Sequence, residues 1–128
     1  MVQSDSSKRL LDGLSVLVVE DEAIISFLLE DMLGELGAAQ IRHAGSVGAA
    51  LKALDDKMPD LAVLDVNLGG ERVYPVAERL DAAGVAFVFT TGYGRSGIEP
   101  QWHARVVVQK PFNVDTMAAA LKSVVSAR

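Results

Sequence analysis

Five short runs of strand-like residues recur along this chain, and segments with a helical repeat of apolar residues separate them. The runs cover residues 16–19, 40–43, 61–64, 86–89 and 106–108. Four of the five are continuously apolar, which is typical of strands that helices cover on both faces, whereas the polar run fits a strand at the edge of a sheet. The pattern therefore predicts a parallel sheet of five strands.

The segments between the runs repeat apolar residues at steps of three and four. They predict helices over residues 25–36, 47–54, 73–80 and 114–125. Ser46 and Asn113 stand where the second and last helices need an N-cap, Gly37 ends the first helix, and a Gly69-Gly70 turn precedes the third. Glycine and proline interrupt residues 95–103, so we expect the fourth connection to be a short helix or a loop.

Strands that alternate with helices predict a doubly wound α/β domain, because right-handed crossovers place helices on both faces of one sheet. Five such units fit the flavodoxin-like strand order 2-1-3-4-5. We expect residues 1–12 to be a flexible N-terminal lead-in and residues 13–128 to form one domain. In sheets of this kind, ligands bind beyond the carboxyl ends of the strands, where the strand order reverses.

Composition removes several classes of function. With 17 acidic and 12 basic residues the formal charge is -5, so nucleic acid is not an expected partner. Because the chain has no cysteine, it cannot form disulfides, thiolate zinc sites or a cysteine nucleophile. The longest apolar run is about five residues, against the roughly 20 that cross a membrane. No membrane insertion or signal peptide is expected, and the predicted location is the cytoplasm.

Polar side chains follow the ends of four of the predicted strands. Glu20 and Asp21 follow the first strand, Asp65 the third, Thr91 the fourth and Lys110 the fifth. Three carboxylates at one edge repel each other unless a cation holds them, and oxygen ligands of this kind favour Mg²⁺. A carboxylate can attack phosphorus, while a lysine and a hydroxyl can bind phosphoryl oxygens. Asp65 is therefore the candidate nucleophile.

This arrangement resembles the receiver domains of two-component response regulators. That family carries an acidic pair, a phosphorylated Asp, a Thr or Ser and a Lys-Pro at successive strand ends, which here are Glu20-Asp21, Asp65, Thr91 and Lys110-Pro111. The resemblance implies that Asp65 accepts a phosphoryl group from a histidine kinase and that Thr91 and Lys110 bind its oxygens. It also implies that Asp21, Asp65 and the backbone carbonyl of Asn67 bind Mg²⁺, that Glu20 assists through water, and that the Lys110-Pro111 peptide is cis.

A narrower resemblance rests on the segment Phe89-Thr90-Thr91-Gly92-Tyr93-Gly94, with Asp65-Val66-Asn67-Leu68-Gly69-Gly70 upstream. It looks like the FAT GUY group of single-domain receivers, which HWE-type histidine kinases usually serve. Two residues depart from the commoner receiver pattern. Glu20 replaces a frequent Asp, and Val107 stands where a switch aromatic is usual. Tyr93 is a candidate to replace that aromatic or to shield the acyl phosphate from water.

Each of these residues also has a simpler reading. Glu20 and Asp21 could cap the first helix, where the helix dipole favours acids, and Lys110 could be an ordinary surface lysine. His43 and His103 are isolated, so we expect them to be structural and not metal ligands or phosphocarriers. Trp102 and Met117 are expected to pack in the core.

Three functions compete at this stage. The first is a phosphoacceptor that signals by protein contact, for example with a histidine phosphotransferase, and that has no enzyme activity beyond Mg²⁺-dependent self-phosphorylation and autodephosphorylation. The second is a receiver-like module that binds partners without phosphorylation. The third is a phosphatase of the haloacid dehalogenase type, whose pattern expects an acid at the position of Asn67. A flavin module is disfavoured because acids follow the first strand.

Overall fold

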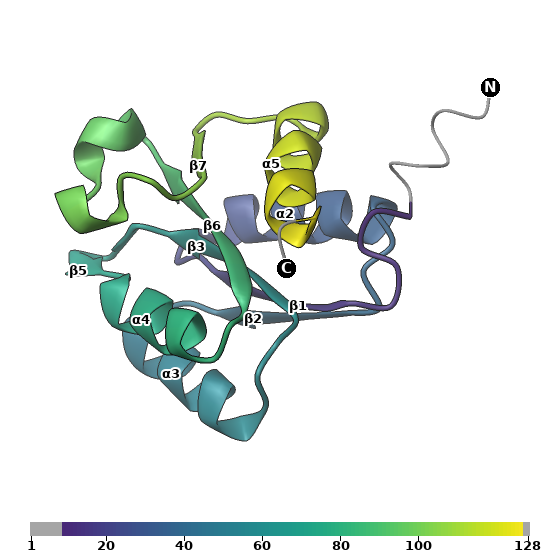
Figure 1. Ribbon diagram of the computed structural model, residues 1–128, viewed down its shortest axis with the longest axis horizontal. Coiled ribbons are helices and arrows are strands. Elements are labelled where there is room, and N and C mark those ends of the chain that lie inside the picture. Colours follow the sequence, from purple (N-terminus) through teal and green to yellow (C-terminus); the bar gives the residue numbers. More distant parts are fainter. Residues whose placement is uncertain (1–8, 127–128) are drawn as a thin grey trace.

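A five-stranded parallel sheet forms the centre of the structure (Figure 1). The computed structural model describes residues 9–126. Its strands are β1 (Ser15–Val19), β2 (Gln40–Ala44), β3 (Leu61–Asp65), β6 (Ala86–Thr91) and β7 (Val107–Gln109). They pair in the order β2-β1-β3-β6-β7, and all four pairings are parallel. Counted without a small separate hairpin, this is the predicted order 2-1-3-4-5, which is confirmed.

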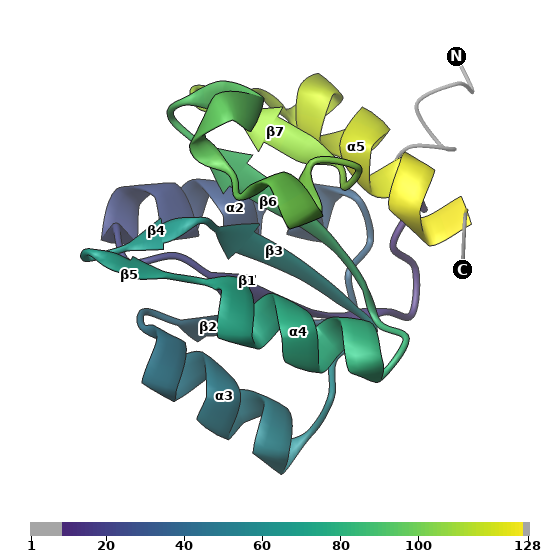
Figure 2. The same ribbon diagram turned by 60° about the vertical axis from the view of Figure 1, so that its left-hand side comes forward.

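Helices cover both faces of the sheet. They are α2 (Ala23–Glu35), α3 (Val47–Asp56), α4 (Tyr74–Ala82) and α5 (Val114–Ser126). Figures 1 and 2 show α2 and α5 on one face and α3 and α4 on the other. Alternate residues of β1 explain why both faces are apolar, since Val16 and Val18 pack in the α2 and α5 layer while Leu17 and Val19 pack in the opposite layer.

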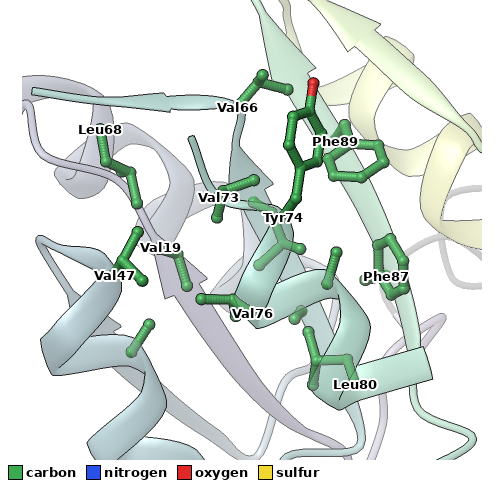
Figure 3. Packing of buried hydrophobic residues seen from close by; sticks show 14 of the residues in the cluster. Val19, Val47, Val66, Leu68, Val73, Tyr74, Val76, Leu80, Phe87 and Phe89 are labelled. Carbon is green, nitrogen blue, oxygen red and sulfur yellow. The ribbon is translucent and has the colours of Figure 1, made fainter. Parts of the chain in front are cut away.

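The layer between the sheet and helices α3 and α4 contains an aromatic cluster. Figure 3 shows Tyr74 beside Phe89, with Phe87 further along the same strand. Trp102 completes the cluster, stacked on Tyr74 with ring centroids 6.2 Å apart and edge-on to both phenylalanines. Trp102 is therefore a core residue, as expected, and Met117 is fully buried in the opposite layer.

The predicted helix ends are confirmed. The Ser46 hydroxyl accepts a hydrogen bond from the backbone N–H of Ala49 at 3.1 Å. The Asn113 side chain accepts one from the N–H of Thr116 at 2.8 Å. These are N-caps of α3 and α5. Gly37 follows the end of α2 with φ of 99°, a left-handed conformation that glycine adopts without steric cost.

One connection differs from the sequence prediction, and a second agrees with it. A hairpin, β4 (Asn67–Leu68) and β5 (Glu71–Arg72), precedes α4 where we expected only a turn. Its loop is Gly69-Gly70, and both residues have positive φ, 58° and 95°, as a two-residue hairpin loop requires. In the fourth connection, between β6 and β7, two short 3₁₀ turns stand where an α-helix could have formed, η1 (Gly94–Gly97) and η2 (Pro100–Trp102), which confirms the expected short, irregular form.

The packed domain begins earlier than predicted. Of the expected lead-in, residues 1–8 lie outside the described part of the chain. Leu11 is fully buried, and its N–H donates to the carbonyl oxygen of Leu36 at 2.8 Å. A backbone bridge joins Asp12 to Ala38. Residues 10–12 therefore belong to the folded domain, because Leu11 fills the α2 and α5 layer. Among the described residues, no helix has the length and apolarity to cross a bilayer.

Candidate functional site

Strand alternation brings Glu20, Asp65 and Lys110 to one point. Each lies two residues beyond a strand residue of the α2 and α5 layer, Val18, Val63 and Val108 respectively. Since alternate residues share a face and the strands are parallel, the three side chains emerge at the same edge and on the same side. The Lys110 Nζ lies 3.1 Å from Glu20 Oε1 and 3.4 Å from Asp65 Oδ2. The sequence prediction that these groups converge is thus confirmed by the geometry.

The two carboxylates are buried, and burial dominates their acidity. Burial raises the pKa of Glu20 to about 7, with Asp65 raising it further and the Glu22 N–H and Lys110 opposing the shift. Burial also raises the pKa of Asp65, against the influence of Lys110. Burial alone would lower the pKa of Lys110, but Asp65 and Glu20 outweigh it and the net shift is upward. When both carboxylates are ionised, Lys110 neutralises only part of their negative charge.

This imbalance predicts a dependence of stability on pH in the metal-free protein. Because Glu20 has a pKa of about 7 in the folded state and 4.5 as its ordinary value, the folded state holds the proton more tightly. Stability is then lost as pH rises from about 4.5 to about 7, by on the order of 3 kcal/mol. Thermal unfolding in a chelator at pH 5 and 7.5 measures this. Glu20→Gln should flatten the profile, and an unchanged profile in that variant would contradict the assignment.

An acidic cluster of three carboxylates stands at this edge. One oxygen from each of Glu20, Asp21 and Asp65 lies within 4.8 Å of the others. Asp21 is exposed, and a Cβ at Gly69 would lie 3.7 Å from its Oδ2, so the hairpin loop borders the cluster. An all-oxygen donor set of this kind fits a hard divalent ion such as Mg²⁺. The backbone carbonyl of Asn67 as a further ligand stays a prediction.

A cavity of about 370 Å³ opens beside Asp65. Its lining includes Asp65, Asn67, Arg72, Thr91 and Tyr93. Thr91 lines this space, and its hydroxyl oxygen accepts a hydrogen bond from the Tyr93 N–H at 3.1 Å. Thr91 lines this cavity together with Asp65, whereas Thr90 is 1% exposed and does not belong to the described lining, so Thr91 is the hydroxyl suited to a group on Asp65. Tyr93 is 77% exposed at the cavity, a position that would let it cover the opening.

A model of the response regulator receiver domain matches residues 16–122. This chain belongs to the response regulator receiver family. The receiver is 28% identical over 123 residues to the probable chemotaxis protein CheY of Rhizobium etli, an alignment that covers 91% of this chain and 95% of the relative. Receiver domains typically bind Mg²⁺ at an acidic pocket, and the described residues of this chain include the acidic cluster of Glu20, Asp21 and Asp65.

Solved structures agree with this assignment over nearly the whole receiver. SdrG from Sphingomonas melonis Fr1 is 40% identical, with a TM-score of 0.79, and the match covers 91% of this chain and 98% of SdrG. The BeF3-activated conformation of SdrG, from Pseudomonas melonis Fr1, is 41% identical with a TM-score of 0.75, covering 87% and 95% of the two chains. The flavodoxin-like α/β fold predicted from the strand pattern is therefore confirmed.

A second, apolar cavity lies beside Lys110, which contacts Asp65. It has a volume of about 310 Å³, and its lining is Ile25, Leu28, Lys110, Pro111 and Phe112. The Lys110-Pro111 peptide in its wall is cis, which confirms the expectation from the resemblance. Three large apolar side chains of α2 near this cavity are exposed: Ile24 at 75%, Phe27 at 69% and Leu28 at 50%. We call these three residues the α2 patch.

Sequence reasoning missed one polar residue of the site. Arg72 lines the cavity beside Asp65, and its Nη1 donates to the carbonyl oxygen of Gly97 at 3.3 Å. The signal that could have found it is Gly69-Gly70, because two glycines between short strand-forming segments are typical of a hairpin. The two histidines lie apart from the site in structural contacts: His43 with Ser26 at 2.7 Å and His103 with the carbonyl of Ile98 at 2.7 Å.

Proposed function

We propose that this receiver is a phosphoacceptor of a two-component system and that Asp65 is the residue phosphorylated. The observation that carries the proposal is a buried carboxylate at the end of the central strand, 3.4 Å from the Lys110 ammonium and within an acidic cluster. The BeF3-activated conformation known for the similar protein SdrG supports it. In this proposal the protein has no enzyme activity beyond its own phosphorylation and dephosphorylation.

The proposed reaction moves one phosphoryl group from a phosphohistidine to Asp65. A carboxylate oxygen of Asp65 attacks phosphorus, a P–O bond forms, the P–N bond breaks, and the released imidazole takes a proton from water. Lys110 is placed to neutralise charge on the phosphoryl oxygens because it already contacts Asp65. Thr91 lines the same cavity as Asp65 and can donate its hydroxyl proton to a second oxygen.

Mg²⁺ is the proposed cofactor. Asp21 and Asp65, with the Asn67 carbonyl, would hold it, and it would neutralise charge on the transferring group. Both oxygens of Glu20 already have donors, Lys110 Nζ at 3.1 Å and the Glu22 N–H at 3.0 Å. Glu20 is therefore suited to act through a bridging water and to orient Lys110. Its longer side chain, in place of the more frequent Asp, reaches both donors.

A histidine kinase, of the HWE type by the subgroup resemblance, is the proposed donor. Its phosphohistidine must reach Asp65, so the kinase must cover the surface around the acidic edge. The α2 patch and the apolar cavity adjoin that edge through Lys110, which lines the cavity and contacts Asp65. An amphipathic helix that carries the phosphohistidine fits an apolar groove of this kind. A histidine phosphotransferase that receives the group would use the same surface.

Phe27→Ser tests this docking surface. Phe27 is 69% exposed, so the substitution should barely change stability, but we expect transfer from a kinase to slow by at least tenfold. The probe is the HWE-type kinase that labels the wild-type receiver fastest, followed by radiolabel transfer. Phosphorylation by a small phosphodonor should not change. Lys52→Ser, exposed on α3 at the opposite face, is the matched control. Wild-type transfer rates in Phe27→Ser would rule out the α2 patch.

The direct test of the proposed function is intact mass after incubation with a small phosphodonor, with and without Mg²⁺. One added phosphoryl group that appears only with Mg²⁺ is the expected result. If neither the phosphodonor nor a kinase modifies the chain, the phosphorylation-independent binding module becomes the better description. Continuous release of phosphate would instead indicate the phosphatase alternative, although Asn67 offers no carboxyl group to act as its acid and base.

A further inference from the structure

One cation at the site has no role in the reaction proposed above. Arg72 lies on β5 directly opposite Asn67 in the hairpin register. Directly opposed residues of an antiparallel pair project from the same face, and both Arg72 and Asn67 line the cavity that holds Asp65 and Thr91. Two positive-φ glycines make this tight hairpin possible. The hairpin therefore presents a guanidinium to the space that a phosphoryl group on Asp65 would fill.

The charge at the site favours a second cation once Asp65 is phosphorylated. A phosphoryl group brings a charge of about -2 at neutral pH. Mg²⁺ and Lys110 favour the ionised form of Glu20, and the phosphoryl group, Glu20 and Asp21 then carry about one more negative charge than Mg²⁺ and Lys110 neutralise. Arg72 is the one cationic side chain among the described residues that line the cavity. A guanidinium binds phosphoryl oxygens well because its planar N–H groups match their geometry.

The present partner of Arg72 links it to the η1 turn. Its Nη1 bonds to the carbonyl oxygen of Gly97 at 3.3 Å, a long hydrogen bond to a neutral acceptor. Gly97 also packs tightly on the site, since a Cβ there would lie 2.9 Å from Tyr93 Cβ and 3.3 Å from Thr91 Oγ1. Arg72, Thr91 and Tyr93 thus all contact the same residue of η1. A movement of Arg72 or Thr91 toward Asp65 would therefore change the contacts that hold the η1 turn in place.

We propose that Arg72 binds an oxygen of the phosphoryl group on Asp65 and, in doing so, releases the carbonyl oxygen of Gly97. The inference rests on the proposed phosphorylation of Asp65. A charged phosphoryl oxygen is the stronger acceptor, because charge-assisted hydrogen bonds are roughly twice as strong as neutral ones. Arg72 then has two alternative partners, and phosphorylation decides between them. The η1 turn, which packs on Thr91 and Tyr93, is the segment that responds.

Beryllofluoride binding tests the inference, because the bound group has the tetrahedral shape of a phosphoryl group on a carboxylate. Full-length wild type, Arg72→Gln, Arg72→Lys and the control Arg79→Gln are titrated with it in Mg²⁺ and followed by amide NMR. Arg79 is a suitable control since it pairs with Asp55 across α3 and α4, away from the cavity. Mg²⁺ alone is titrated separately, and thermal unfolding checks that every variant is folded.

We expect Arg72→Gln to raise the half-saturating beryllofluoride concentration about fivefold to tenfold, the loss of one charge-assisted contact at a partly exposed site. Arg72→Lys should recover part of it, while Mg²⁺ affinity and the Arg79→Gln titration stay at wild-type values. Without beryllofluoride, the Gly97 amide of Arg72→Gln should already shift toward its position in the complex. This shift reports the lost Gly97 contact and not affinity.

The outcomes separate this inference from the function on which it rests. If wild type binds beryllofluoride and Arg72→Gln binds it equally well, Asp65 keeps its role and Arg72 loses the one assigned here. If Arg72→Gln weakens Mg²⁺ binding as much as beryllofluoride binding, Arg72 acts on the metal site and the inference is overturned. If wild type fails to bind beryllofluoride in Mg²⁺, the proposed function itself fails, and the role of Arg72 fails with it.

Discussion

Asp65→Asn is expected to abolish the phosphoryl adduct completely. The reaction needs a carboxylate oxygen as nucleophile, and an amide cannot supply one. Intact mass after incubation with a small phosphodonor and Mg²⁺ should show one added group on wild type and none on the variant. The fold should survive, because Asp65 is buried against Glu20 and its own carboxylate is a source of repulsion at the site. In the metal-free protein the variant should be at least as stable as wild type.

Two controls define what this result means. Asp55→Asn removes an exposed carboxylate on α3 that pairs with Arg79 at 2.5 Å, and it should be modified at the wild-type rate. Asp21→Asn keeps the nucleophile but removes an exposed carboxylate of the acidic cluster, so its adduct should form slowly and need more Mg²⁺. An adduct of equal size and rate on Asp65→Asn would show that another residue is the acceptor.

Trp102→Ala is expected to have the largest effect on stability. Trp102 is 6% exposed and contacts three other aromatic rings, with centroid distances of 5.8 to 6.2 Å. Truncation of a large buried aromatic residue costs about 3–5 kcal/mol, a large share of the 5–15 kcal/mol typical of a domain. Urea unfolding followed by far-UV circular dichroism measures it. Fluorescence is unsuitable because Trp102 is the single tryptophan.

Trp102→Phe is the matched substitution. The Trp102 Nε1 has no hydrogen-bond partner among the described residues, so a phenyl ring loses packing volume but no polar contact. Arg105 lies over the rings of both Phe87 and Trp102, at 5.1 Å and 5.5 Å, and can remain stacked. We expect a cost of about 1 kcal/mol. A Trp102→Ala variant that costs no more than this would mean that η2 contributes little to the core.

The main architecture could be predicted because it depends on apolar repeats that local sequence displays. Continuous runs such as residues 86–89 identify strands with two buried faces, and caps such as Ser46 and Asn113 mark helix ends. The convergence of Glu20, Asp65 and Lys110 followed from parallel strand ends alone. The runs and caps can be read from each segment by itself, and the convergence then needs only the general rule for parallel strands.

What could not be predicted depends on contacts between distant segments. Arg72 reads as an ordinary surface arginine until the hairpin register places it opposite Asn67 and its hydrogen bond reaches Gly97, 25 residues later in the chain. Leu11 is similar, since the pair Leu10-Leu11 follows a polar stretch and is too short to show a strand or helix period. The raised pKa of Glu20 also follows from burial that only the folded packing creates. The narrower FAT GUY assignment stays a prediction.

The burial of Leu11 bears on how this domain can be cut from, or joined to, other polypeptides. Leu11 occupies the layer beneath α2 and α5, and its N–H ties the segment before β1 to the end of α2. A shortened chain that starts at Gly13 would leave a leucine-sized hole and an unpaired carbonyl at Leu36. A tag or fusion partner should therefore be attached ahead of Leu10, because a junction there keeps Leu11 buried and keeps its hydrogen bond to Leu36.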